Sequence, residues 1–357
     1  MGCASARAVD VAGDNELTQN YELGNMIGKG TYGKIFEATH RETKKVRAVK
    51  VLEFTTVTAD QALLAAWEEE RMCRRVGRHE NIVKLLDVFS GDRHFCMVME
   101  RCEQSLTERM PSLIHMCGSG LSKPLRQMLG GLAQVHGRRV VHRDIKPDNF
   151  LLGGPDGRTV KLCDFGMSAV EPRNGRLLRG TYGTMPYMSP EMLGAEGHDR
   201  STDLWSLGAV TYMMVYGDLP YTVQKRSHRL MKAAIMHGPQ PTFTSLVAEA
   251  KDRKIPDGAE SLARAALRPE PGQRRLAEDL LRHPYLADGA PSGQRKCAKA
   301  LSAGSSRTSS GEIIDMDLAM TMASTETGGT RSMSMRMSSL ASLTSVTGIS
   351  EAARSWL

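Results

Sequence analysis

The sequence predicts an α+β fold in which a strand-rich N-terminal part is followed by a larger helical part. The first observation is the stretch 21–54, where short β-type runs alternate with Gly and charged turns. The second is the segment 60–76, where apolar residues recur at helical spacing among Glu and Arg. The third is the series of longer apolar runs at 125–135, 201–217 and 259–267, which predicts a helical second half.

The composition limits the class of protein. The chain has 357 residues, of which 41% are hydrophobic and 24% charged, enough apolar material for one large or two modest cores. Lys and Arg outnumber Asp and Glu by 47 to 40, but they are scattered along the chain, so we expect no nucleic-acid partner. Seven cysteines without a Cys-x-x-Cys pair argue against disulfides and structural zinc and favour a reducing, cytoplasmic location. Neither a spanning helix nor a secretory signal is indicated.

Three regions separate on composition. A polar leader covers residues 1–20, a mixed body covers 21–287, and a tail rich in Ser, Thr and Met covers 288–357. Between Leu301 and Ser350 there are 20 Ser or Thr and no Trp, Tyr or Phe, so the tail lacks the apolar pattern of a segment that packs on a core. We expect one folded domain in the body and a disordered tail.

A glycine-rich turn lies near the start of the body. Gly28, Gly30 and Gly33 stand between two β-type runs, where absent side chains let backbone N–H groups approach an anionic ligand. A dinucleotide-binding turn requires a helix after the last glycine, but 34–40 has a strand pattern, and the Gly-Lys-Ser/Thr of a Walker loop is absent. A purely structural hairpin stays open on this motif alone.

Lys50 is predicted to point inward with an acidic partner. It shares one face of a β-type run with Ala48, because strand side chains alternate with period two. A buried ammonium needs a counter-charge. Of three consecutive glutamates in the helix that follows, Glu69 lies three, four and seven residues before the apolar Met72, Cys73 and Val76, so it is the inward one. The alternative is that all three glutamates are solvated.

The segment VVHRDIKPDNFLL, followed by CDFG, carries the most specific signal. Asn149 precedes Asp164 by 15 residues, and both follow His142-Arg143-Asp144. Together with the glycine turn, Lys50 and Glu69, these residues resemble a eukaryotic Ser/Thr protein kinase from about residue 21 to 286. The resemblance implies a bilobal fold with a small antiparallel-sheet N-lobe at about 21–102 and a larger helical C-lobe at about 103–287.

The resemblance implies ATP and Mg²⁺ as cofactors and proteins as substrates. Asp144 would orient the acceptor hydroxyl and take its proton, and Lys146 would hold charge on the γ-phosphate. Asn149 and Asp164 would be the Mg²⁺ ligands, and Lys50 with Glu69 would complete the catalytic set. A lysine at position 146 and a threonine at position 184 resemble the sequence pattern of the Ser/Thr-directed kinases. The residues implied for nucleotide binding are Ile27, Gly28, Lys29, Gly30, Gly33, Ile35, Ala48, Lys50, Met99, Glu100, Cys102 and Leu151.

Other positions take family roles by the same resemblance. Met99 would be the gatekeeper beside the adenine, Glu100 and Cys102 would present their backbone to it, and Glu103 would reach the ribose. An apolar column that aligns the two lobes would stand on Asp203. Its members would be Cys73, Leu85, His142 and Phe165. Glu191 would pair with Arg274 beside the substrate.

The C-lobe segments most resemble the calmodulin-dependent and calcium-dependent kinase group, although no EF-hand calcium loop follows. The basic segment 294–301 is too short to establish calmodulin binding. Met1-Gly2-Cys3 is a candidate acylation signal, with Gly2 for a myristoyl and Cys3 for a palmitoyl chain, which would add a membrane surface as partner. The alternative to an active kinase is a pseudokinase scaffold, which the intact catalytic set disfavours.

Overall fold

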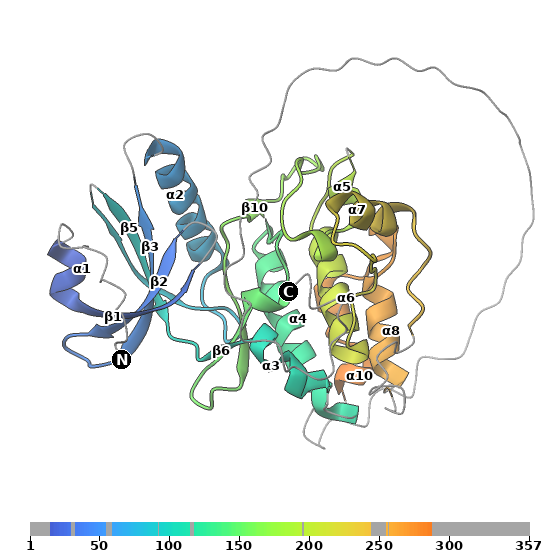
Figure 1. Ribbon diagram of the computed structural model, residues 1–357, viewed down its shortest axis with the longest axis horizontal. Coiled ribbons are helices and arrows are strands. Elements are labelled where there is room, and N and C mark those ends of the chain that lie inside the picture. The colour runs from blue at the N-terminus through green and yellow to red at the C-terminus, as the bar shows by residue number, and fades with distance from the viewer. Residues whose placement is uncertain are drawn as a thin grey trace, which may run out of the picture. The chain divides into compact units, whose positions relative to one another are not determined.

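The computed structural model confirms the α+β fold class, with strands first and helices after them (Figure 1). The structure describes residues 15–29, 33–54, 59–91, 93–114, 118–194, 196–243, 255 and 257–287. The expected strand 34–40 is present with those bounds, and the expected helix 60–76 begins one residue earlier.

The N-terminal part is a five-stranded antiparallel sheet in the order β1-β2-β3-β5-β4. Its strands are β1 (Tyr21–Lys29), β2 (Lys34–His40), β3 (Val46–Glu53), β4 (Leu85–Ser90) and β5 (His94–Glu100). In β3 the segment from Ala48 to Leu52 is buried, as expected of a central strand covered on both faces. The register places Ala48 opposite Met99 and Lys50 opposite Met97.

Helix α2 (Ala59–Val76) packs against one face of this sheet. Its Ala66 joins Leu52, Phe95 and Met97 in one apolar cluster. The Trp67 ring meets Phe95 edge-on at 4.8 Å between centroids. The helix therefore holds a fixed position relative to β3, which is what a side-chain contact from α2 to Lys50 requires.

The opposite face of the sheet is covered by helix α1 (Asn15–Asn20), within the segment that the sequence indicated only as a polar leader. Leu17 is fully buried in a cluster with Tyr21, Phe36 and Val49. Because a single apolar residue in six gives no periodicity, the sequence pattern did not reveal this helix. The other leader residues, Gly2 and Cys3 among them, lie outside the described residues.

The second part of the domain is mainly helical, with two small sheets, β6-β8-β9 and β10-β7. Their strands are β6 (Gln104–Ser105), β7 (Val140–Val141), β8 (Phe150–Gly153), β9 (Thr159–Leu162) and β10 (Ala169–Val170). The helices are α3 (Leu106–Ile114), α4 (Ser122–Gly137), α5 (Pro190–Leu193), α6 (Ser201–Tyr216), α7 (His228–His237), α8 (Asp257–Ala266), α9 (Ala277–Leu280) and α10 (Pro284–Ala287).

Helix α6 is the centre of this part. All 16 of its residues are buried, which fits a sequence that is apolar around the whole helix. Gly208 accommodates α8, because a Cβ atom there would lie 2.8 Å from the Cβ of Ala266. The helices within the described ranges are all too short or too polar to cross a membrane. The first residues of α6, including Asp203, lie directly beneath the loop that carries His142 and Asp144.

Candidate active site

Lys50 and Glu69 form the expected ion pair. The Lys50 Nζ atom donates to both carboxylate oxygens of Glu69, at 2.6 and 2.7 Å, and lies 3.5 Å from Asp164 Oδ1. Both side chains of the pair are 4% exposed. Burial opposes the charge of Lys50, but the carboxylates of Glu69 and Asp164 hold its pKa above the ordinary value. The lysine therefore stays charged at the point where strand β3, helix α2 and the loop after β9 meet.

Asp144 has both carboxylate oxygens occupied by fixed donors. Lys146 Nζ lies 2.8 Å from Oδ2, and Thr184 Oγ1 donates to Oδ1 at 2.9 Å. Asn149 Nδ2 donates to the Asp144 backbone oxygen at 2.8 Å and to Oδ2 at 3.2 Å. Lys146 Nζ also donates to Thr184 Oγ1 at 3.0 Å. These three side chains fix one orientation of the carboxylate, whose residue is 4% exposed.

Asp203 holds the backbone of this loop from below. Its carboxylate accepts the backbone N–H groups of His142 and Arg143, each at 2.8 Å, and contacts His136 Nε2 at 2.9 Å. Burial works against its charge, but the His136 hydrogen bond and the two backbone donors hold the pKa of Asp203 below the ordinary value. Arg143 adopts a φ of 67°, a left-handed conformation that needs such support. The predicted base of the apolar column is therefore an anchor for the loop.

Asp164 lies across from this loop. It has a φ of 63°, and the ring of the next residue, Phe165, meets His142 at 5.2 Å. Burial works against its charge, but Lys50 and other cations hold the pKa of Asp164 below the ordinary value. Burial raises the pKa of the neighbouring Cys163 thiol, which fits an unreactive, half-buried cysteine.

The donors present suit Mg²⁺. Because Asn149 donates both of its observed bonds through Nδ2, its amide oxygen is left as the candidate ligand, beside the Asp164 carboxylate. No group of three or more His, Cys, Asp or Glu capable of holding a metal is found in the described ranges. Mg²⁺ typically takes only one or two protein ligands and completes its coordination shell with phosphates and water. Two protein ligands, Asn149 and Asp164, therefore suffice for a Mg²⁺ site that a bound nucleotide completes.

Comparison with known proteins agrees with this geometry. Residues 21–286 match the family model of the protein kinase domain. The chain belongs to the protein kinase family. It is 30% identical over 282 residues to a probable serine/threonine-protein kinase of Zea mays, covering 78% of this chain and 43% of the relative. It is 29% identical over 294 residues to a probable myosin light chain kinase of Dictyostelium discoideum, covering 82% of this chain and 90% of the relative. It is 28% identical over 292 residues to the human serine/threonine-protein kinase H1, covering 79% and 65%.

The chain is also 30% identical over 274 residues to a serine/threonine-protein kinase of Arabidopsis thaliana. It spans less than half of the length of the maize relative and 19% of the length of the Arabidopsis relative. The shared part is the kinase domain. Roles of the individual residues follow from their geometry.

The structure brings the two strands of the kinase glycine turn together but assigns its glycines different tasks. Gly28 pairs with Ile35 across β1 and β2, and the next residue, Lys29, pairs with Lys34. A Cβ at Gly28 would meet Ile35 at an ordinary 3.8 Å, whereas a Cβ at Gly33 would lie 2.5 Å from the Val51 backbone oxygen. Gly33 is thus required for packing of the turn on β3. Gly30 lies outside the described residues.

The expected adenine edge is formed by backbone groups of Glu100 and Cys102. The Cys102 carbonyl accepts a hydrogen bond from the Arg101 side chain. The backbone N–H of Cys102 has no backbone partner among the described residues. The Glu100 N–H is bonded to the Lys84 carbonyl at 3.0 Å, which leaves the Glu100 carbonyl as the group to face the base. The expected gatekeeper Met99 lies opposite Ala48 across β5 and β3.

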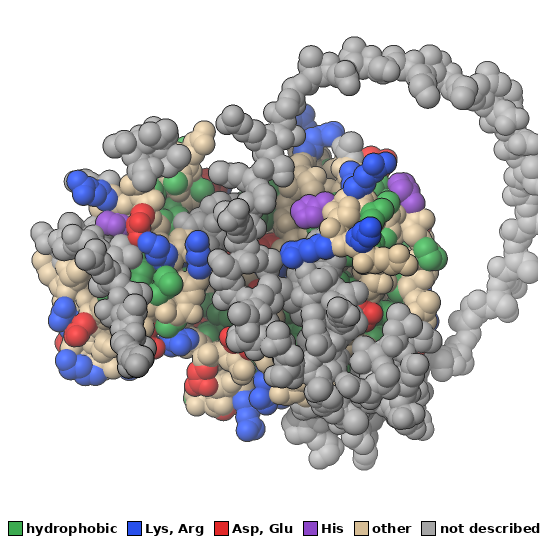
Figure 2. All heavy atoms as spheres, viewed as in Figure 1, with side chains coloured by type: hydrophobic (Ala, Val, Ile, Leu, Met, Phe, Trp, Pro, Cys, Tyr) green, Lys and Arg blue, Asp and Glu red, His purple; other side chains and the backbone are tan. Residues whose placement is uncertain are grey.

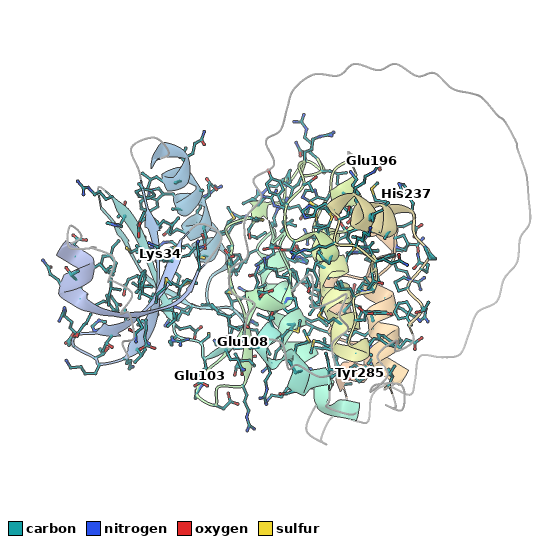
Figure 3. All side chains as sticks on the ribbon, viewed as in Figure 1. Lys34, Glu103, Glu108, Glu196, His237 and Tyr285 are labelled. Carbon is teal, nitrogen blue, oxygen red and sulfur yellow. The ribbon has the colours of Figure 1, made fainter. Side chains whose placement is uncertain are left out.

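The remaining pocket residues lie on the expected elements. Ile27 on β1 is 39% exposed, and Leu151 on β8 pairs with Ser105 and Lys161. Glu103, the residue expected to contact the ribose, has its carboxylate against Gly157. Its Oε2 atom lies 2.8 Å from the position that a Cβ atom would take on this glycine. Figure 3 shows Glu103 beside the turn between β8 and β9. The structure therefore directs Glu103 to the turn, which does not support its predicted ribose role.

Sequence reasoning missed a clamp behind the adenine edge. The Glu100 carboxylate contacts the buried Lys161 on β9 at 3.0 Å and accepts the Lys84 N–H at 2.8 Å. Lys161 Nζ also donates to the Glu80 carbonyl at 2.9 Å. The clamp joins β5, β9 and the segment after α2. The only signal in the sequence was a lysine within the apolar run of β9, which alternation would place on one face.

The substrate side contains the predicted pair of Glu191 and Arg274. Arg274 Nη1 and Nη2 meet the two carboxylate oxygens at 2.5 and 2.9 Å, and the arginine side chain is fully buried. The serine at 189, where the family usually has alanine, has a structural task as well. Its Oγ accepts the Met192 N–H at 3.3 Å and bonds Thr202 Oγ1 at 2.7 Å, so it caps α5 and ties it to α6.

Proposed function

We propose that this protein is an active kinase that transfers the γ-phosphoryl group of ATP to Ser or Thr hydroxyls of proteins. The observation that carries the proposal is the buried Asp144 carboxylate, held by Lys146, Asn149 and Thr184. A carboxylate fixed in this way orients an acceptor hydroxyl and takes its proton, which is the task that phosphoryl transfer requires of the protein.

The cations are placed to neutralise phosphate charge. Lys146, 20% exposed, neighbours Asp144 and would contact the transferred group, while Lys50 would contact the inner phosphates. Asn149 and Asp164 would hold Mg²⁺, which supplies charge neutralisation on the phosphate oxygens when bound. Glu69 positions Lys50, because without it the ammonium would be drawn toward Asp164 alone.

Serine and threonine are the favoured acceptors. Thr184 and Lys146 lie at the mouth of the site and bond each other at 3.0 Å. Both residues contact Asp144, and both carry the resemblance to the Ser/Thr-directed kinases. Incubation with labelled ATP and a protein mixture, followed by phosphoamino-acid analysis, tests the proposal. Phosphoserine and phosphothreonine are expected, and labelling of tyrosine alone would contradict it.

The pseudokinase alternative makes a different forecast. A scaffold of that kind binds nucleotide without transferring phosphate, but here the six residues that bind, position and transfer are all present. They are Lys50, Glu69, Asp144, Lys146, Asn149 and Asp164. Protein that demonstrably binds ATP and Mg²⁺ yet labels no polypeptide would favour the alternative.

We also propose membership in the calmodulin-dependent and calcium-dependent group, and a cytoplasmic location with membrane attachment through Gly2 and Cys3. The first is supported by the C-lobe segments 198–222 and 280–286 and the second by the Met1-Gly2-Cys3 start. Both the acylation signal and the basic segment 294–301 lie outside the described residues. Activity with and without calcium-calmodulin tests a calmodulin partner, and equal soluble fractions of wild type and Gly2→Ala would end the membrane proposal.

A further inference from the structure

The loop after Tyr221 and helix α7 carry a basic surface. From Leu219 to Phe243 the chain has four Lys or Arg, two His and no Asp or Glu. All six side chains are exposed, and Figure 2 shows blue and purple side chains gathered at the upper right, over the place of α7 in Figure 1. The α7 basic surface consists of Lys225, Arg226, His228, Arg229, Lys232 and His237.

The helix presents these charges outward for a simple reason. Met231 and Ile235, four residues apart, are buried and attach α7 to the domain. Arg229 and Lys232, three residues apart, share the outward side. Ser227 caps the helix by accepting the Leu230 N–H at 3.4 Å, which fixes where it begins. Arg229 and Lys232 therefore project from a rigid helix, while Lys225 and Arg226 lie in the loop directly before it.

Three of these six charges are not neutralised locally. Among the described residues, no carboxylate lies within 4.0 Å of the Lys225, Arg229 or Lys232 ammonium or guanidinium nitrogens, by contrast with the exposed pairs Arg264–Glu260 and Arg282–Asp279. One exposed carboxylate, that of Glu196, belongs to the segment that directly follows α5 and is labelled in Figure 3. Several like charges without partners create a field that attracts an acidic ligand.

The surface adjoins the place where a substrate must lie. Helix α7 packs against α5 and against the 3₁₀ helix Met185–Tyr187. That 3₁₀ helix directly follows Thr184, which is bonded to Asp144 at 2.9 Å. A polypeptide whose hydroxyl reaches Asp144 and whose chain continues over 185–187 therefore meets α7.

We propose that the α7 basic surface binds acidic residues flanking the acceptor Ser or Thr, so that the substrates are proteins with an acidic segment beside the phosphorylated residue. The inference rests on the proposed kinase activity and names its substrate class. A polypeptide is favoured over a nucleic acid because α7 packs against the 3₁₀ helix that follows Thr184, next to Asp144, and the proposed acceptor there is a protein hydroxyl. The scattered basic residues of the sequence gave no sign of this gathering.

Synthetic peptides test the proposal. Each carries one Ser acceptor and a block of either Glu or Gln, placed before or after it. Wild type is expected to show a KM about tenfold lower for one of the Glu peptides than for its Gln counterpart, with similar kcat, because the block adds binding away from the reacting group. Added salt should remove this preference, since exposed charges are screened.

The variant Lys225→Ala/Arg229→Ala/Lys232→Ala is expected to lose the preference and to keep its kcat on the Gln peptides. The matched control, Lys45→Ala/Arg109→Ala/Lys123→Ala, removes three exposed cations from other elements and should keep it. Equal KM values of wild type for Glu and Gln peptides, or an unchanged preference in the α7 variant, would overturn the inference. Failure of the wild type on all peptides and proteins would instead count against the kinase activity itself.

Discussion

The Thr184 hydroxyl donates to Asp144 Oδ1 at 2.9 Å, which ties the substrate-side segment to the proposed catalytic carboxylate. Because Lys146 Nζ contacts both residues, loss of the hydroxyl would release one oxygen of Asp144 and one bond of Lys146. Thr184 is therefore a positioning residue.

Replacing Thr184 tests this relationship. We expect Thr184→Val to lower kcat by about 10- to 100-fold, because a small misorientation of a catalytic group costs a factor of that order. Thr184→Ser keeps the hydroxyl and should retain most of the activity. Steady-state kinetics with a fixed peptide would measure both. Equal kcat values for the Val and Ser variants would show that the hydrogen bond does not position Asp144.

Glu69→Gln tests the ion pair with Lys50. The amide retains the shape of the side chain but removes the charge that balances a buried ammonium, which leaves Asp164 at 3.5 Å as the nearest carboxylate. We expect kcat/KM for ATP to fall about 100-fold, since the positioned cation serves charge stabilisation. Glu68→Gln, on the exposed side of α2, is the matched control and should leave kcat/KM within about twofold of wild type. A similar loss in both variants would contradict the account.

The two glycines of the turn offer a comparison of stability. Gly33→Ala should lower the free energy of unfolding by about 2 kcal/mol, because its Cβ would lie 2.5 Å from the Val51 oxygen and force the turn to shift. Gly28→Ala should change it by less than about 1 kcal/mol, since the nearest atom lies at 3.8 Å. Urea unfolding measures both. A smaller loss for Gly33→Ala than for Gly28→Ala would refute the packing argument.

His198 predicts a pH dependence of stability. Burial and the nearby Arg143 lower its pKa, although Asp203, Glu191 and Asp199 act in the opposite direction. Both ring nitrogens lack a hydrogen-bond partner within the described part of the chain. Since the unfolded chain binds the proton more readily, this contribution to stability is complete above about pH 6.5 and declines as the pH falls toward the folded pKa.

The variant His198→Phe removes that group while it keeps the buried volume and the backbone bonds to Leu178. Its free energy of unfolding should fall less steeply than that of wild type between about pH 6.5 and 5. Parallel pH profiles of the two proteins would mean that His198 is not held in its neutral form.

Much of the site was predictable because its residues obey strong local patterns. Helical spacing alone selected Glu69 over its two neighbours, and strand alternation placed Lys50 inward. The structure shows both in contact. The strand-rich start and the long helices likewise followed from periodicities that continue over many residues, whereas the antiparallel sheet was implied by the kinase resemblance.

The parts that were missed depend on contacts between distant segments. Leu17 is a single apolar residue whose burial needs the sheet above it, and the Glu100–Lys161 clamp joins strands 61 residues apart in sequence. The position of the Glu103 carboxylate could not be predicted because it lies against Gly157, in a turn that the sequence does not position. The structural role of Ser189 depends on its hydrogen bond with Thr202, which lies on another helix. Local patterns carry no information on such pairs.

The most direct test of the central claim is phosphoryl transfer by Asp144→Asn under single-turnover conditions with saturating ATP and Mg²⁺. The amide retains the shape of the side chain and one accepting oxygen but cannot take the proton, so we predict unchanged ATP binding and a rate at least about 100-fold lower than wild type. An Asp144→Asn protein that binds ATP and labels a Ser peptide at the wild-type rate would contradict the proposed role of this carboxylate.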